Sequence, residues 1–405
     1  METTAALDGL ACTECDARHD PATVAGRCPD CGGPLVATYD ADAVATDRAS
    51  LADRRFDGLA RYADLLPFEL DAAVSMTEGT TPLVACPDLA DELGVEAVYV
   101  KDEGTNPTGT TADRGMALAV AAARAHGAEE VALPTTGDAG QSAAAYAARA
   151  GLDSEAFVPT RSTFVAKAMT NVHGGEMSVV GGRYPDAVAA FEDAMVEART
   201  AADESDGPET ASLAPFDTPY RHEGAKTLLF EVVEQLDWTV PDAVVHPTGH
   251  GLGVVGSHLA SEQLQAAGLV DETPALHVAQ PEACAPVVAA DDEGADDTEV
   301  WDQPDTLVGS LEVPDPAGGA LALDAIRETG GWAVGVSDDD ALEAAVTVAG
   351  EGVEMSATGG VGAAAAWELA GSGQLDSDDT VVLVNPVAGN KENDVLRSHL
   401  MRQGI

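Results

Sequence analysis

Basic residues are scarce in this chain, which has 20 lysines and arginines against 70 acidic residues and a formal net charge of −50. A protein that binds nucleic acid or an anionic membrane surface needs a basic face, so this composition excludes such partners. The acids are scattered along the whole length and would repel one another in dilute buffer, whereas about 1 M salt shortens the Debye length to about 3 Å. We therefore expect a halophilic protein of a salt-rich cytoplasm.

Long apolar runs are also absent. No stretch approaches the roughly 18 apolar residues that span a bilayer. The first residues, METTAALDGL, carry an acid where a signal peptide has a basic end, so we expect a cytoplasmic chain with no membrane partner. The 405 residues, of which 45% are hydrophobic, are enough for two or three domains with a buried core.

Cysteine is rare outside one short segment. Four of the six cysteines form two CxxC pairs, Cys12 with Cys15 and Cys28 with Cys31, separated by 12 residues. Two such pairs can wrap one tetrahedral zinc ion, because each spacer places both thiolates on the same side of a tight turn. We therefore predict a structural zinc ribbon over residues 1–45, with two disulfides or free thiols as the alternative that a reducing cytoplasm disfavours.

The rest of the chain, 46–405, alternates short apolar runs with alanine-rich helical stretches. This alternation is typical of a parallel sheet with helices on both faces. The predicted strands are 98–102, 131–135, 156–159, 177–180, 243–247, 276–279, 332–336 and 381–385. The predicted helices are 117–126, 143–150, 186–202, 223–236, 254–267 and 339–348. Ligands of such sheets bind in the turns that follow the strands.

Three strand-to-helix turns are rich in glycine and small residues. They are 106–115 (NPTGTTADRG), 135–142 (TTGDAGQS) and 248–253 (TGHGLG). Glycines spaced in this way let backbone N–H groups approach a phosphate at a helix N-terminus. A capped helix start for the first turn and a plain tight turn for the third are the alternatives.

Several segments together resemble the threonine synthase family of pyridoxal-phosphate (PLP) enzymes. EGTTPL at 78–83 resembles the family's EGxTPL, KDE at 101–103 its KxE, YRHEGAKT at 220–227 its YRxEGxKT, and 333–340 its AVxVSDEE. The cysteine-rich segment resembles the zinc ribbon of many archaeal members.

The resemblance implies a fold of two open-sheet α/β domains, PLP fold type II or tryptophan synthase beta-like, with PLP in the cleft between them. It implies a large domain of about 75–110 and 210–405 and a small domain of about 111–209. Because members of this fold type are often dimers, a homodimer is expected by resemblance alone.

Three positions that hold the cofactor's ring in the family differ here. The family's NPTGSFKDRG supplies the Schiff-base lysine at the position of Ala112, and a methyl group can neither attach PLP nor move protons at the substrate. The family's STGN supplies an asparagine to the phenolate oxygen, where the carboxylate of Asp138 would repel it. The family's TGxGxKD supplies a hydroxyl to the pyridine nitrogen, where Ala388 has none. PLP binding is therefore doubtful.

The third turn resembles the family's phosphate cradle, with histidine in place of the usual asparagine. It consists of Gly249, His250, Gly251, Leu252 and Gly253. We therefore expect a threonine synthase-like protein that lacks the Schiff-base lysine, does not convert O-phosphohomoserine to threonine, and binds a small phosphorylated metabolite.

The alternative is an active PLP-dependent threonine synthase, a carbon–oxygen lyase acting on phosphate, that uses another lysine. Lys101 is the nearest candidate in sequence. A regulator of the same fold without enzymatic activity is a third interpretation. Structural roles compete with these, since Lys101 is expected to pair with an acid at its own strand end, and Lys167 and Lys226 to be ion-pair partners.

Overall fold

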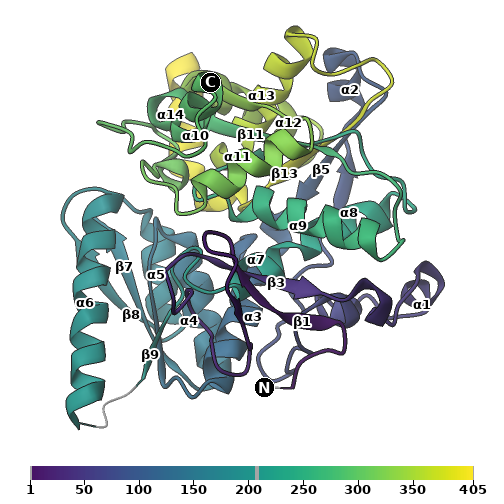
Figure 1. Cartoon of the computed structure of the whole chain (residues 1–405). Coiled ribbons are helices and arrows are strands. Elements are labelled where there is room, and N and C mark those ends of the chain that lie inside the picture. The colour runs from purple at the N-terminus through teal and green to yellow at the C-terminus, as the bar shows by residue number, and fades with distance from the viewer. Residues whose placement is uncertain (1, 206–208, 405) are drawn as a thin grey trace. The chain divides into compact units, whose positions relative to one another are not determined.

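The computed structural model describes residues 2–205 and 209–404, which form two compact units (Figure 1). Unit 1 comprises 2–80, Ala112–Thr227 and Ala266–Leu269, and unit 2 comprises Thr81–Thr111, Leu228–Gln265 and the chain from Val270 onward. Within the described ranges, no helix is both long and apolar enough to cross a membrane.

Unit 1 begins with a small antiparallel sheet in which β1 is the central strand. Its strands are β1 (Leu7–Cys12), β2 (Arg18–His19) and β3 (Leu35–Tyr39). Its core contains only Leu10, Leu35 and the side chains of Cys12 and Cys28, with three partly buried residues packed against them. So small an apolar core is insufficient to hold the segment folded, so the segment needs a further constraint.

The larger sheet of unit 1 is parallel, with the order β8-β7-β6-β9. Its strands are β6 (Glu130–Pro134), β7 (Asp153–Pro159), β8 (Glu176–Val180) and β9 (Thr210–Ser212). Its helices are α3 (Ala112–Ala125), α4 (Asp138–Ala150), α5 (Phe164–Val172), α6 (Tyr184–Ser205) and α7 (Tyr220–Ala225). Val131 and Leu133 of β6 pack with α3 and α4, while Ala132 between them packs with α6, as the alternation of a strand requires.

Helices α3 and α7 of unit 1 cross where both contain glycine. A Cβ atom on Gly224 would lie 2.1 Å from the carbonyl oxygen of Arg114, and a Cβ on Gly115 would lie 2.6 Å from that of Arg221. Neither distance is compatible with a larger residue, so the two glycines fix how closely the first turn of α3 approaches α7.

Unit 2 contains a six-stranded sheet of order β12-β11-β10-β13-β5-β4, parallel except for the edge strand β4. Its strands are β4 (Leu83–Ala85), β5 (Ala97–Asp102), β10 (Ala243–Pro247), β11 (Ala275–Pro281), β12 (Ala333–Val336) and β13 (Thr380–Asn385). Its helices are α2 (Pro87–Leu93), α8 (Thr227–Gln235), α9 (Leu252–Ala266), α10 (Pro286–Glu293), α11 (Gly319–Glu328), α12 (Asp338–Ala349), α13 (Ala357–Gly371) and α14 (Asn393–Gln403).

All eight predicted strands are present, with ends that differ by at most three residues. The prediction of a single helix over 223–236 is wrong, because α7 ends at Ala225 and α8 begins at Thr227. The break coincides with the point where the chain leaves unit 1 for unit 2. The antiparallel strand β4 and the short edge strand β9 were not predicted.

Candidate functional site

The carboxyl ends of three adjacent strands of unit 2 bring three turns to one edge of its sheet. Strands β10, β13 and β5 are neighbours and run parallel, so the turns 248–253, 386–392 and 103–111 follow them at the same edge. The last two turns are joined by backbone hydrogen bonds from Thr111 N to Pro386 O (2.7 Å) and from Ala388 N to Gly109 O (3.0 Å). This edge is where a ligand of an open α/β sheet is expected.

The glycine turn after β10 is held rigidly within unit 2. Gly251 has a φ of +91°, which favours glycine, and a Cβ on it would lie 3.1 Å from the carbonyl oxygen of Gly318. The carbonyl of His250 accepts from Gly318 N (3.1 Å), and its ring Nδ1 accepts from Ala317 N (3.2 Å). Because Nδ1 is an acceptor, the proton of the neutral ring resides on Nε2, which makes that atom a donor.

The first turn of α9 follows this glycine turn directly, because α9 begins at Leu252. A Cβ on Gly253 would lie 3.2 Å from Nδ1 of His246, whose side chain is buried. Burial lowers the pKa of His246 to about 3, so its ring is neutral, and its Nε2 has no hydrogen-bond partner among the described residues. The turn thus offers backbone N–H groups at a helix N-terminus above a neutral imidazole, an arrangement that suits an anion.

The turn after β13 contains Ala388, whose methyl group faces the turn after β5. A Cβ on Gly109 would lie 3.3 Å from the Cβ of Ala388 and 3.3 Å from the Cε of Lys391. Lys391 is buried and was not considered as a candidate from the sequence. Its place three residues after Ala388, in the segment that resembles TGxGxKD, is the signal that could have found it.

Asn385 ties the end of β13 to the start of α13. Its Oδ1 accepts from Ser356 N (3.1 Å) and from Ser356 Oγ (2.9 Å), and its Nδ2 donates to Asp102 Oδ1 (2.9 Å). Burial raises the pKa of Asp102, although the hydrogen bonds from Asn385 and from the backbone of Gly104 oppose this. Ser356 also caps α13 by accepting from Gly359 N (2.8 Å).

Ala112 and Asp138 both belong to unit 1 and both begin helices. Ala112 is the first residue of α3. Asp138 is the first residue of α4 and follows Gly137, whose φ of +149° is left-handed. The residue after Ala112, Asp113, is buried and accepts a hydrogen bond from Ser142 Oγ (2.5 Å), which ties α3 to α4.

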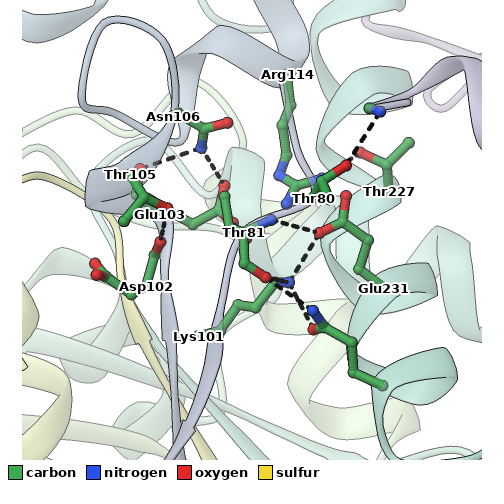
Figure 2. A network of polar contacts seen from close by, with 12 residues as sticks. Thr80, Thr81, Lys101, Asp102, Glu103, Thr105, Asn106, Arg114, Thr227 and Glu231 are labelled. Atoms are coloured by element: carbon green, nitrogen blue, oxygen red, sulfur yellow. Dashed lines mark hydrogen bonds and ion pairs between the residues drawn. The ribbon is translucent and has the colours of Figure 1, made fainter. Parts of the chain in front are cut away.

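Lys101 is itself fully buried and lies in a polar network of unit 2 (Figure 2). Its Nζ donates to Thr81 O, to Glu231 Oε2 and to Gln235 Oε1, each at 2.8 Å. An ammonium has three N–H donors, and these three acceptors match them. This is the geometry of a structural cation.

The acid that pairs with Lys101 at 2.8 Å is Glu231 of α8, 130 residues along the chain and not at the strand end that the sequence suggests. At that strand end, the carboxylate of Glu103 accepts from Thr81 Oγ1 (2.6 Å) and from Asn106 Nδ2 (2.8 Å), as Figure 2 shows.

Lys226 and Lys167, both in unit 1, differ in their surroundings. Lys226 is buried, forms an ion pair with Glu223 at 2.6 Å, and lies 4.2 Å from the ring centre of Tyr39. The hydroxyl of Tyr39 donates to Glu223, so strand β3 is anchored to α7 by this cluster. Lys167 donates to the carbonyl of Thr160 (2.9 Å).

The four cysteines of the amino-terminal segment converge. Their sulfur atoms all lie within 4.8 Å of one another, with 3.4 Å between Cys12 and Cys31 and 3.8 Å between Cys15 and Cys28. Four ligands about 2.3 Å from a tetrahedral zinc ion are about 3.8 Å apart, so the donor set fits zinc. Backbone N–H groups also approach two of the sulfurs, from Glu14 to Cys12 and from Gly33 to Cys31.

Comparisons with known proteins agree with this geometry. The family model "Pyridoxal-phosphate dependent enzyme" matches residues 74–386. Among solved structures, maize serine racemase superposes with a TM-score of 0.67 at 16% identity, covering 89% of this chain and all of that one. Threonine deaminase isoform 2 from Solanum lycopersicum superposes with a TM-score of 0.66 at 19% identity, covering 81% and 84% of the two chains. The fold is that of the PLP-dependent enzymes of fold type II.

Two curated archaeal relatives show which family of PLP-dependent enzymes the chain resembles over most of its length. The threonine synthase of Methanosarcina acetivorans is 32% identical over 93% of this chain and 90% of its own length. The threonine synthase of Methanocaldococcus jannaschii is 32% identical over 95% of this chain and 93% of its own. The chain therefore belongs to the threonine synthase family of PLP-dependent enzymes.

Proposed function

We propose that this chain is a threonine synthase homologue that does not attach PLP covalently and that binds a small phosphorylated ligand at Gly249–Gly253. The observation that carries the proposal is the contrast between two positions. Residue 112, which by the resemblance of NPTGTTADRG takes the place of the family's Schiff-base lysine, is alanine, whereas the glycine turn before α9 has a left-handed Gly251 and backbone N–H groups at a helix N-terminus.

The residues present do not fit the pyridoxal ring. Ala112 offers no amine, Ala388 offers no hydroxyl, and Asp138 offers a carboxylate where the family has an amide. A carboxylate accepts hydrogen bonds but does not donate them when it is ionised, so it repels a phenolate oxygen. By contrast, the backbone donors of the glycine turn depend on no side chain.

An active threonine synthase that uses another lysine is the alternative function. A lysine that forms a Schiff base must present a neutral amine with a lone pair. The Nζ of Lys101 instead donates to three acceptors, including the buried carboxylate of Glu231, and Lys226 forms a buried pair with Glu223. The contact of Lys101 with Glu231 favours its charged form. Burial lowers the pKa of Lys226, against the opposing effect of Glu223, but its amine is engaged by that carboxylate, and both arrangements support a structural role.

The same proposal includes a structural zinc ion bound by Cys12, Cys15, Cys28 and Cys31. Its support is the convergence of the four sulfur atoms at the spacing of a tetrahedral site. Zinc would replace the apolar core that this segment lacks.

Two measurements in high-salt buffer test the function. Inorganic phosphate at a concentration well above its dissociation constant is expected to raise the melting temperature, because a ligand that binds only the folded state stabilises it. Sulfate and chloride at equal ionic strength are the controls. Incubation with O-phosphohomoserine and PLP is expected to release no threonine. Threonine formation, abolished by Lys101→Ala in a variant that still folds, would establish the alternative.

A further inference from the structure

One imidazole and two carboxylates converge where helices α9 and α11 of unit 2 meet. His258 and Glu262 belong to α9, and Glu328 is the last residue of α11. One ligand atom from each side chain, a ring nitrogen and two carboxylate oxygens, lies within 4.8 Å of the others. His258 Nε2 is 3.1 Å from Glu328 Oε2. Imidazole and carboxylate are common protein ligands of divalent metal ions.

The spacing along α9 and the packing of α11 bring the three side chains together. His258 and Glu262 are four residues apart and share one face of α9, beginning about 9 Å along the helix axis from its start. The starts of the two helices also meet, since a Cβ on Gly251 would lie 3.4 Å from the Cβ of Ala322. The helices therefore run in the same direction, and the cluster lies two to three turns beyond the glycine turn.

The cluster is negatively charged. In the described parts of the chain, neither Glu262 nor Glu328 forms an ion pair with a lysine or an arginine. Arg327, the nearest basic residue in sequence, is directed elsewhere, because its Nη2 donates to Ala295 O (2.8 Å) and its Nε is 3.6 Å from Asp291 Oδ1. Glu328 also lies at the carboxyl end of α11, where the helix dipole is negative. These charges favour a cation between the two carboxylates.

The spacing and the exposure indicate which kind of cation fits. Adjacent ligands about 2.2 Å from an octahedral ion are about 3.1 Å apart, which is the distance between His258 Nε2 and Glu328 Oε2. The side chain of His258 is only 15% exposed, but both glutamates are exposed, so water completes the coordination. Magnesium and calcium ions prefer oxygen ligands alone, whereas the imidazole favours a first-row transition metal.

We propose that His258, Glu262 and Glu328 form a site for a divalent first-row transition metal ion, and that their two carboxylates and the added water make Mn²⁺ a suitable occupant. The bound ion crosslinks α9 to α11 and stabilises the fold of unit 2. The site shares no residue with the four cysteines or with the glycine turn, so its test does not depend on the proposed function.

The competing explanation is an ordinary ion pair between His258 and Glu328. Glu262 separates the two explanations, because it takes no part in that pair but supplies the third ligand of the metal site. Glu262 is exposed, so Glu262→Gln is expected to fold normally.

The test is a titration of the zinc-loaded protein with Mn²⁺, followed by the electron paramagnetic resonance signal of the unbound ion. Concentrated KCl and excess Mg²⁺ suppress weak binding to the acidic surface. We expect one saturable Mn²⁺ per chain and a rise in the melting temperature. His258→Ala and Glu262→Gln are each expected to weaken binding at least about tenfold, since loss of even an outer-shell partner of a metal costs about 10–100-fold.

Glu343→Gln is the matched control. His399 Nε2 is likewise 3.1 Å from Glu343 Oε2, and the side chain of Glu343 is 57% exposed, against 62% for Glu328. Within the described ranges, that pair belongs to no group of three side chains able to hold a metal. The control removes the same charge as Glu262→Gln and is expected to keep the full affinity for Mn²⁺.

Three results would overturn the proposal. The first is the absence of saturable Mn²⁺ binding to the unmodified protein. The second is an unchanged affinity in folded Glu262→Gln, which would leave only the ion pair of His258 and Glu328. The third is an equal loss of affinity in Glu343→Gln, which would show that binding follows the net charge of the surface.

Discussion

The buried pair of Lys101 and Glu231 gives a large and specific prediction for stability. Their charged atoms are 2.8 Å apart, and their side chains are 0% and 1% exposed. Lys101→Met leaves the carboxylate of Glu231 buried without its counter-charge, and breaking such a pair typically costs about 3–5 kcal/mol. The same change removes one donor to Thr81 O, which still accepts from Gln235 Nε2 (2.8 Å), and one to Gln235 Oε1, which lies on an exposed residue, so we expect a loss within that range.

Urea unfolding in concentrated KCl measures this loss. As a matched control, Arg402→Met breaks the exposed pair with Asp339, whose side chains are 55% and 75% exposed, and is expected to change the free energy of unfolding by less than about 1 kcal/mol. Replacing both members, Lys101→Met with Glu231→Leu, is expected to restore most of the loss. A Lys101→Met protein as stable as the Arg402→Met protein would refute the reasoning.

Three further predictions concern the ribbon and the buried histidines. Metal analysis is expected to find one zinc per chain, and Cys12→Ser, or a chelator, is expected to lower the melting temperature. Tyr39→Phe removes the donor to buried Glu223 and is expected to lower the free energy of unfolding by about 1–3 kcal/mol in urea, with no loss of zinc. Burial lowers the pKa of His222 and of His246 from 6.5 to about 3. Between pH 3 and pH 6.5, each of these histidines is protonated in the unfolded chain but neutral in the folded protein. Their contribution to the free energy of unfolding is therefore complete above pH 6.5 and falls as the pH is lowered. The free energy of unfolding is expected to fall by about 2 kcal/mol for each histidine by about pH 5, and His246→Leu is expected to flatten its dependence on pH.

The sheet strands were predictable from the sequence because each is a short apolar run between turn residues. The strand β13 is an example, since its residues from Val381 to Val384 are buried on both faces, as a central parallel strand requires. The edge strand β4 was not predictable, because it has only three residues and none of them is fully buried. The break at Lys226 also left no local signal, and it coincides with the passage of the chain from unit 1 to unit 2.

The candidate site was predictable only in part. The glycine turn before α9 could be found because glycine spacing is a local property. The partner of Lys101 could not, because Glu231 is 130 residues away along the chain and chain proximity favoured an acid at the end of its own strand.

The central claim, that the chain does not attach PLP through a lysine, has one direct test. The purified protein is incubated with PLP in high-salt buffer, reduced with borohydride and digested, and its peptides are mapped by mass spectrometry. The account predicts no stoichiometric adduct on any of the four lysines, and an adduct at position 112 in the Ala112→Lys variant. A stoichiometric adduct on Lys101, Lys167, Lys226 or Lys391 of the unmodified protein would contradict it.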